Sequence, residues 1–123
     1  MNWWSPYVGL EFGPINCWSL VTKVYKEQLG IELQSYDTKP EEVRAVHKAI
    51  SEGQNENIWK AVNDPETFDV VVMKNPRTAR IGHVGIMVDS KRVLHIDTKT
   101  FSVVVPLTHI SVKGRISGFR RMI

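Results

Sequence analysis

The apolar residues of this chain change their spacing near residue 65, and this change constrains the fold more than any other feature. Before it, Leu20, Val21, Val24 and Tyr25 recur at the three- and four-residue spacing of an amphipathic helix. After it, apolar residues form short runs between polar turns, as in Phe68 to Met73, which is the pattern of β-strands. A chain whose helices come first and whose strands then follow one another through short turns is expected to form an α+β fold with an antiparallel sheet.

The expected elements follow from the same patterns. Residues Trp3 to Ile15 predict an extended N-terminal segment that ends in a Gly-Pro turn. The first expected helix runs from about Cys17 to Leu29, and Gly30 stops it. A second helix is expected after Asp37-Thr38-Lys39-Pro40 and ends at Gly53. A short helical turn is expected from Ile58 to Val62. The expected strands are Phe68 to Met73, His83 to Val88, Arg92 to Ile96, Phe101 to Pro106 and Ile116 to Arg121. N-terminal helices should therefore pack on an antiparallel sheet of about five strands, in which hairpin spacing makes neighbours of the His83 and His95 strands.

Length and composition suit one globular domain, residues 1–123, with 42% hydrophobic and 24% charged residues. The net charge of +3 suits an anionic partner such as a cell-wall polymer. The basic residues lack the interleaved aromatic residues of a strand-binding platform, so we expect no nucleic-acid partner. We also expect no membrane partner and no signal peptide, because no apolar run is long enough to span a bilayer and the start of the chain lacks a basic and apolar leader.

Cys17 is the only cysteine in the chain, and it follows the Gly13-Pro14 turn at the start of the first expected helix. The helix macrodipole and the free backbone N–H groups at such a position favour a thiolate over a thiol. A single cysteine excludes an internal disulfide and a multi-cysteine zinc finger. Because lone cysteines are more often inert core residues, the prediction of a nucleophile depends on partners elsewhere in the chain.

Two histidines in strand-like surroundings supply those partners. A thiolate that attacks an amide needs a proton carrier for the departing amine, and imidazole titrates in the right range. We predict Cys17 as the nucleophile, His83 as the general base and His95 as the residue that orients His83 from the adjacent strand. Gly82 and Gly85 favour His83 as the base, because they leave room for a substrate backbone.

Backbone N–H groups at the start of the first helix would hold the oxyanion, and the Tyr7 hydroxyl is a further candidate donor. Other side chains receive no role. We interpret His47 as a structural or surface residue and the tryptophans as core or interface anchors, and we assign no role to His109, which lies in a loop-like stretch. The basic residues of the C-terminal half are interpreted as a solvated face: Lys91, Arg92, Lys113, Arg115, Arg120 and Arg121.

We expect no cofactor and no metal. The alternative is a zinc site with an open position, made by Cys17, His83 and His95, whose ligand types suit zinc although their spacing matches no recognised zinc motif.

Four blocks in the chain also match a known family: Tyr7, the run from Phe12 to Val21, the run from Phe68 to Met73, and the run from His83 to Val88 with Val93-Leu94-His95. With these blocks the chain resembles the NlpC-type superfamily of papain-like cysteine peptidases, and most closely its small phage tail-associated branch. The closing run from Arg115 to Arg120 resembles the family's final strand. Two departures stand out: the common Asp-Cys-Ser-Gly-Leu is Asn16-Cys17-Trp18-Ser19-Leu20 here, and the expected helical insert from Thr38 to Val62 is not part of the minimal core.

The resemblance implies a papain-like NlpC-type fold in which Cys17, His83 and His95 take the three catalytic roles and Tyr7 lies near the oxyanion site. It implies hydrolysis of peptidoglycan stem peptides at the γ-D-glutamyl–diaminopimelate bond. It also implies phage tail-tip or hub proteins as partners, and a location in the virion tail or, after delivery, in the host periplasm or cell wall. The alternative is a structural tail-tip or tail-assembly subunit that keeps the fold with little or no catalytic activity.

Overall fold

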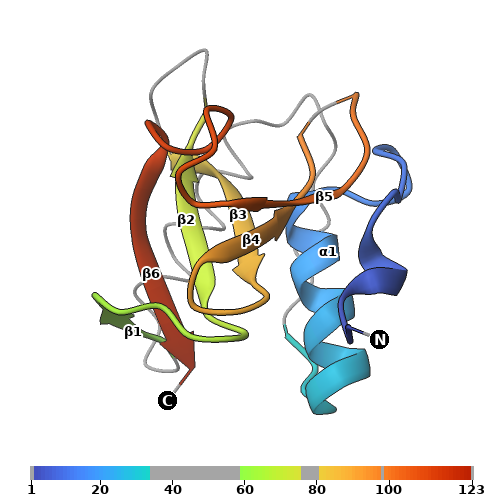
Figure 1. Cartoon of the computed structure of the whole chain (residues 1–123). Coiled ribbons are helices and arrows are strands. Elements are labelled where there is room, and N and C mark those ends of the chain that lie inside the picture. The colour runs from blue at the N-terminus through green and yellow to red at the C-terminus, as the bar shows by residue number, and fades with distance from the viewer. Residues whose placement is uncertain (1, 34–58, 76–80, 98, 123) are drawn as a thin grey trace.

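A computed structural model describes residues 2–33, 59–75, 81–97 and 99–122 (Figure 1). The expected second helix lies outside the described residues. The helical elements are η1 (Ser5–Tyr7), α1 (Cys17–Val24) and the π-helical turn η2 (Tyr25–Leu29). The strands are β1 (Trp59–Val62), β2 (Val70–Lys74), β3 (Ile81–Met87), β4 (Arg92–His95), β5 (Val103–Pro106) and β6 (Ile116–Met122). None of the helices in these ranges has the length and apolarity needed to cross a membrane.

The first expected helix is confirmed as α1 continued by η2, and local sequence explains both of its ends. At the start, the Asn16 side chain accepts the backbone N–H of Ser19, and the Ser19 hydroxyl accepts the backbone N–H of Asn16. This reciprocal capping satisfies two backbone donors that a helix start leaves unpaired. At the end, Gly30 adopts the left-handed conformation with a φ of 67°, which glycine adopts without steric cost.

The strands form one six-stranded antiparallel sheet in the order β1-β6-β2-β3-β4-β5. Strands β2 to β5 make a meander, and β6 then returns along the free edge of β2. As predicted, β3 and β4 are antiparallel neighbours, with Ile86 opposite Leu94 and Met87 opposite Val93. The two histidine-bearing strands therefore lie side by side within the sheet.

Several of the sequence-based assignments differ from the structure. The expected helical turn from Ile58 to Val62 is instead strand β1, because its backbone pairs with β6 and Trp59 packs on Tyr25 with a ring separation of 6.0 Å. The sheet therefore has six strands rather than five. The N-terminal segment contains the 3₁₀ turn η1 around Pro6, and β2 begins at Val70 because Phe68 has a positive φ of 74°.

Both faces of the sheet are buried at β2. Val70 and Val72 of β2 point into a cluster that includes Leu20 and Val24 of α1, while Val71 and Met73 point into a second cluster on the opposite face. This alternation explains why β2 is a continuous apolar run in the sequence. In Figure 1, α1 lies along one side of the sheet beside β3 and β4, and its N-terminal residue is Cys17.

Candidate active site

Cys17 is the first residue of α1 and is half-buried. Its thiol accepts hydrogen bonds from the backbone N–H groups of Val84 and Trp18, and each lowers the thiol pKa. Burial is the larger influence and raises the pKa of the Cys17 thiol above its usual range, with the Asp97 carboxylate acting in the same direction. The prediction that the helix start makes the thiolate the favoured form is therefore wrong, because desolvation outweighs the backbone donors.

His83 of β3 and His95 of β4 are both buried, and their rings are nearly perpendicular, with an interplanar angle of 79°. The His83 Nε2 and His95 Nδ1 atoms are 3.0 Å apart, which is a hydrogen-bond distance. The pairing of β3 with β4 produces this contact, as the hairpin spacing predicted. The thiol of Cys17 belongs to the same region, since its donor Val84 directly follows His83 in β3.

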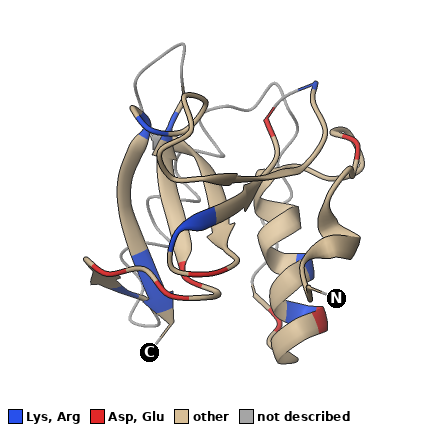
Figure 2. Cartoon of the chain, in the orientation of Figure 1, with Lys and Arg blue, Asp and Glu red and all other residues tan. Residues whose placement is uncertain are grey.

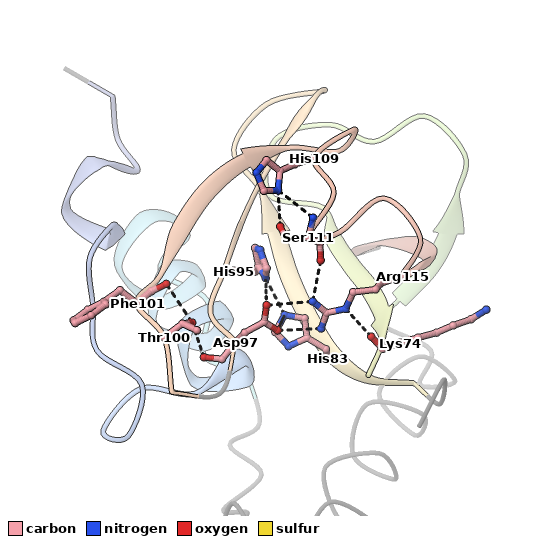
Figure 3. A network of polar contacts seen from close by, with 9 residues as sticks. All are labelled: Lys74, His83, His95, Asp97, Thr100, Phe101, His109, Ser111 and Arg115. Atoms are coloured by element: carbon pink, nitrogen blue, oxygen red, sulfur yellow. Dashed lines mark hydrogen bonds and ion pairs between the residues drawn. The ribbon is translucent and has the colours of Figure 1, made fainter. Parts of the chain in front are cut away.

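The structure adds two charged residues that the sequence analysis missed. Asp97 lies two residues after His95, with its carboxylate oxygens 3.5 Å from His83 Nε2 and 3.9 Å from His95 Nδ1. Arg115 donates from both terminal nitrogens to this carboxylate, at 3.0 and 3.2 Å (Figure 3). Arg115 was predicted to lie on a solvated face, but its side chain is only 13% exposed, and it also bonds the carbonyls of Lys74 and Ser111.

The surroundings keep both imidazoles neutral near neutral pH. Burial lowers the pKa of His83 to about 3, against the opposing effect of Asp97, and His95 and Arg115 lower it further. Burial also lowers the pKa of His95. Burial alone would raise the pKa of Asp97, but the Arg115 guanidinium and the two imidazoles hold it below its usual value. The resting site therefore contains a thiol, two neutral imidazoles and one carboxylate that is ion-paired with an arginine.

The structure does not bring the Tyr7 hydroxyl to this group. The hydroxyl donates to Glu27 and accepts from Gln28, both of which lie in η2 at the opposite end of the helix from Cys17. Gly85 was also expected to leave room for a substrate backbone, but β4 fills the position of its missing side chain. A Cβ atom there would lie 2.7 Å from Val93 Cγ2.

The three residues of the alternative zinc site are not the ligand-type side chains that lie close together in the structure. In the described ranges, the ligand-type side chains within 4.8 Å of one another are His83, His95 and Asp97, without Cys17. These three could reach a cation, but the Arg115 guanidinium already occupies both oxygens of Asp97 and would repel it. His109, which was given no role, is exposed and pairs with Ser111.

The model of the NlpC/P60 family matches residues 6–121 of the chain. A search of curated proteins finds no match.

Proposed function

Because the chain belongs to the NlpC/P60 family of cysteine peptidases, we propose that it hydrolyses peptidoglycan stem peptides with Cys17 as nucleophile, His83 as base and His95 as orienting residue. The observation that carries the proposal is the hydrogen bond between His83 and His95, next to a helix that begins at the only cysteine in the chain. Cys17 begins α1 and is bonded by the backbone of Val84, which follows His83 in β3, and β3 pairs with β4, which ends at His95.

The reaction begins with proton transfer. His83 uses Nε2 to contact His95, which leaves Nδ1 to accept the proton of the Cys17 thiol. The sulfur then attacks the substrate carbonyl, and the new C–S bond produces a tetrahedral oxyanion. Backbone N–H groups around Cys17 are the available donors for this charge.

The His83 imidazolium next gives its proton to the departing amine, so that the C–N bond breaks and a thioester remains. A water molecule transfers a proton to His83 and attacks the thioester. The acid product leaves as the thiol forms again. Throughout these steps, His95 holds the His83 ring through Nε2 and so fixes which nitrogen exchanges protons.

The specific target that we propose is the γ-D-glutamyl–diaminopimelate bond, and the setting is a phage tail that delivers the enzyme to the host cell wall. The resemblance of the Cys17 and His83 blocks to the tail-associated branch supports this setting, with tail-tip or hub proteins as partners. The positive net charge of +3 suits approach to an anionic polymer. Detection of the chain in purified virions would test the location.

The enzymatic test compares the wild type with Cys17→Ala on purified muropeptides. The wild type should release fragments cut after D-glutamate, and Cys17→Ala should lose this activity by at least about a thousandfold with an unchanged melting temperature. Asp89→Asn is the control, since Asp89 bonds Lys91 and Arg92 at the turn between β3 and β4. Equal cleavage by the wild type and Cys17→Ala would reject the proposal.

The buried, neutral state of the site favours a second candidate, a structural tail subunit with little activity. Burial disfavours both the thiolate of Cys17 and the imidazolium of His83. Iodoacetamide labelling near neutral pH separates the candidates, because a peptidase must expose a reactive thiol. A thiol that stays unlabelled in the folded chain would favour the structural role.

A further inference from the structure

We infer that Asp97 is a positioning residue that stabilises the His83 imidazolium, and that Arg115 fixes Asp97 in the orientation needed to do so. The inference rests on the proposed function, because it concerns the proton that His83 takes from Cys17. Asp97 and Arg115 touch neither the sulfur nor the scissile bond in this scheme. They act through His83.

The geometry supports a direct effect of Asp97 on His83. One carboxylate oxygen of Asp97 lies 3.5 Å from His83 Nε2, and the other lies 3.9 Å from His95 Nδ1. Both imidazoles are buried, so water is a weak competitor for the charge that develops on His83. An opposite charge within about 4–6 Å favours the protonated form of an imidazole. Asp97 is therefore placed to lower the cost of the imidazolium.

His95 is poorly suited to supply this stabilisation by itself. Its Nε2 atom is buried and has no hydrogen-bond partner among the described residues. A neutral His95 that accepts the His83 Nε2–H at Nδ1 carries its own proton at this Nε2 atom, so it brings no negative charge to the site. His95 thus serves as a neutral acceptor for His83, and the negative charge at the site comes from Asp97.

Arg115 accounts for the placement of Asp97. Its planar guanidinium meets both carboxylate oxygens, and the same side chain is held by the carbonyls of Lys74 and Ser111 (Figure 3). Such a two-pronged contact defines orientation as well as charge. The positive charge of Arg115 opposes the His83 imidazolium, so its benefit must come from fixing Asp97.

The charged and titratable groups that act on the imidazoles come from several elements. They are His95 on β4, Asp97 after β4, and Arg115 before β6, with His109 acting on His95 from the same loop as Arg115. Asp97 is the only carboxylate among these groups.

Thiolate absorbance and iodoacetamide rates across about pH 5 to 9 test the inference, and the single cysteine makes both signals specific to Cys17. Asp97→Asn should slow alkylation near neutral pH by roughly tenfold, because the imidazolium that forms as His83 takes the thiol proton loses its counter-ion. In alkaline solution the thiol loses its proton to hydroxide rather than to His83, and loss of the Asp97 charge then favours the thiolate because it lowers the thiol pKa. The rate profiles of the variant and the wild type should therefore cross.

Two further variants distinguish the role of the Asp97 charge from a general effect of removing a carboxylate. Asp97→Glu keeps the charge and should recover part of the neutral rate. Asp89→Asn removes another carboxylate that pairs with an arginine, Arg92, and should leave the whole profile unchanged. The inference would be overturned if Asp97→Asn lowered the alkylation rate equally at every pH, so that the two rate profiles did not cross. It would also be overturned if the rate profile of Asp97→Asn equalled that of the wild type.

Arg115→Gln gives an independent test through the sign of its effect. If Arg115 acted only as a charge, its removal would favour the imidazolium and speed alkylation near neutral pH. Since we infer that it fixes Asp97, we expect slower alkylation, with partial recovery in Arg115→Lys. Faster or unchanged alkylation in Arg115→Gln would overturn this role, even if Asp97→Asn proved unable to fold.

These outcomes are distinct from failure of the proposed function. Absence of muropeptide cleavage by the wild type, with a reactive thiol and crossed profiles, would reject the substrate and keep the inference. Cleavage by the wild type with an unaltered Asp97→Asn profile would reject the inference and keep the function. A wild-type thiol that is unreactive throughout the pH range would reject both.

Discussion

At the scale of single residues, the burial of His83 should make the fold sensitive to acid. Its pKa is near 6.5 when unfolded and is lowered to about 3 in the folded chain. Between these values the unfolded chain binds the extra proton, so stability falls as pH falls below about 6.5. His95, with a lowered pKa, acts in the same direction.

The expected loss from His83 is about 2 kcal/mol between pH 7 and pH 5, measured by urea unfolding at each pH. His83→Gln should reduce this loss, whereas the exposed His109→Gln should keep it. An equal acid dependence in wild type and His83→Gln would show that the buried imidazole does not carry the effect.

Local sequence predicted part of the site, and the missed residues have clear reasons. Cys17, His83 and His95 stood out because their residue types and their local patterns are informative. Asp97 was missed although it lies two positions after His95, and residues two positions apart in an extended chain point to the same side. Arg115 was misassigned because its partner is 18 positions away, and no local pattern distinguishes a buried arginine from a solvated one. The hydroxyl of Tyr7 binds Glu27 and Gln28, which lie far from it in the sequence.

At the scale of elements, Gly85 controls how closely β3 and β4 approach. A Cβ atom at this position would lie 2.7 Å from Val93 Cγ2 and 3.0 Å from the Leu94 carbonyl oxygen. The carbonyl belongs to the backbone, so β4 would have to move, and His95 would move with it.

Gly85→Ala should therefore destabilise the fold by about 1–3 kcal/mol and also slow alkylation of Cys17, because the contact between His83 and His95 depends on this approach. Thermal unfolding and iodoacetamide rates measure the two effects. Gly114→Ala is the control, since a side chain there meets no atom within 4 Å. Stability and reactivity equal to wild type in Gly85→Ala would contradict the role of close approach.

Elements were predictable where local interactions decide them. The apolar spacing and Gly30 indicated the helix from Cys17 to Leu29, and the turn at Asp89 indicated the β3–β4 hairpin. Strand β1 was mistaken for a helical turn because its stability comes from pairing with β6, nearly 60 positions later. Pairing over such a separation leaves no local signal.

At the scale of the whole molecule, Lys and Arg lie on α1, η2, the strands and the loops, whereas Asp and Glu of the described residues lie in η2 and the loops (Figure 2). One ion pair among them links the start of β2 to the last strand. Arg121 of β6 donates to both oxygens of Asp69, at 2.9 and 2.7 Å, and to the carbonyl of Asp64. Asp69 is only 2% exposed and also accepts the backbone N–H of Glu66. This contact holds β6 between β1 and β2.

Asp69→Asn should lower the melting temperature by roughly 5 °C or more, because a buried neutral amide replaces the partner of Arg121. It should leave the pH profile of Cys17 alkylation unchanged, since His83 pairs with Met73 at the other end of β2. Glu66→Gln is the control: Glu66 also contacts Arg121, at 3.4 Å, but is 71% exposed and should contribute little. A changed alkylation profile in Asp69→Asn would mean that the sheet transmits strain to the site, and that the effects of Asp97 variants need the same correction.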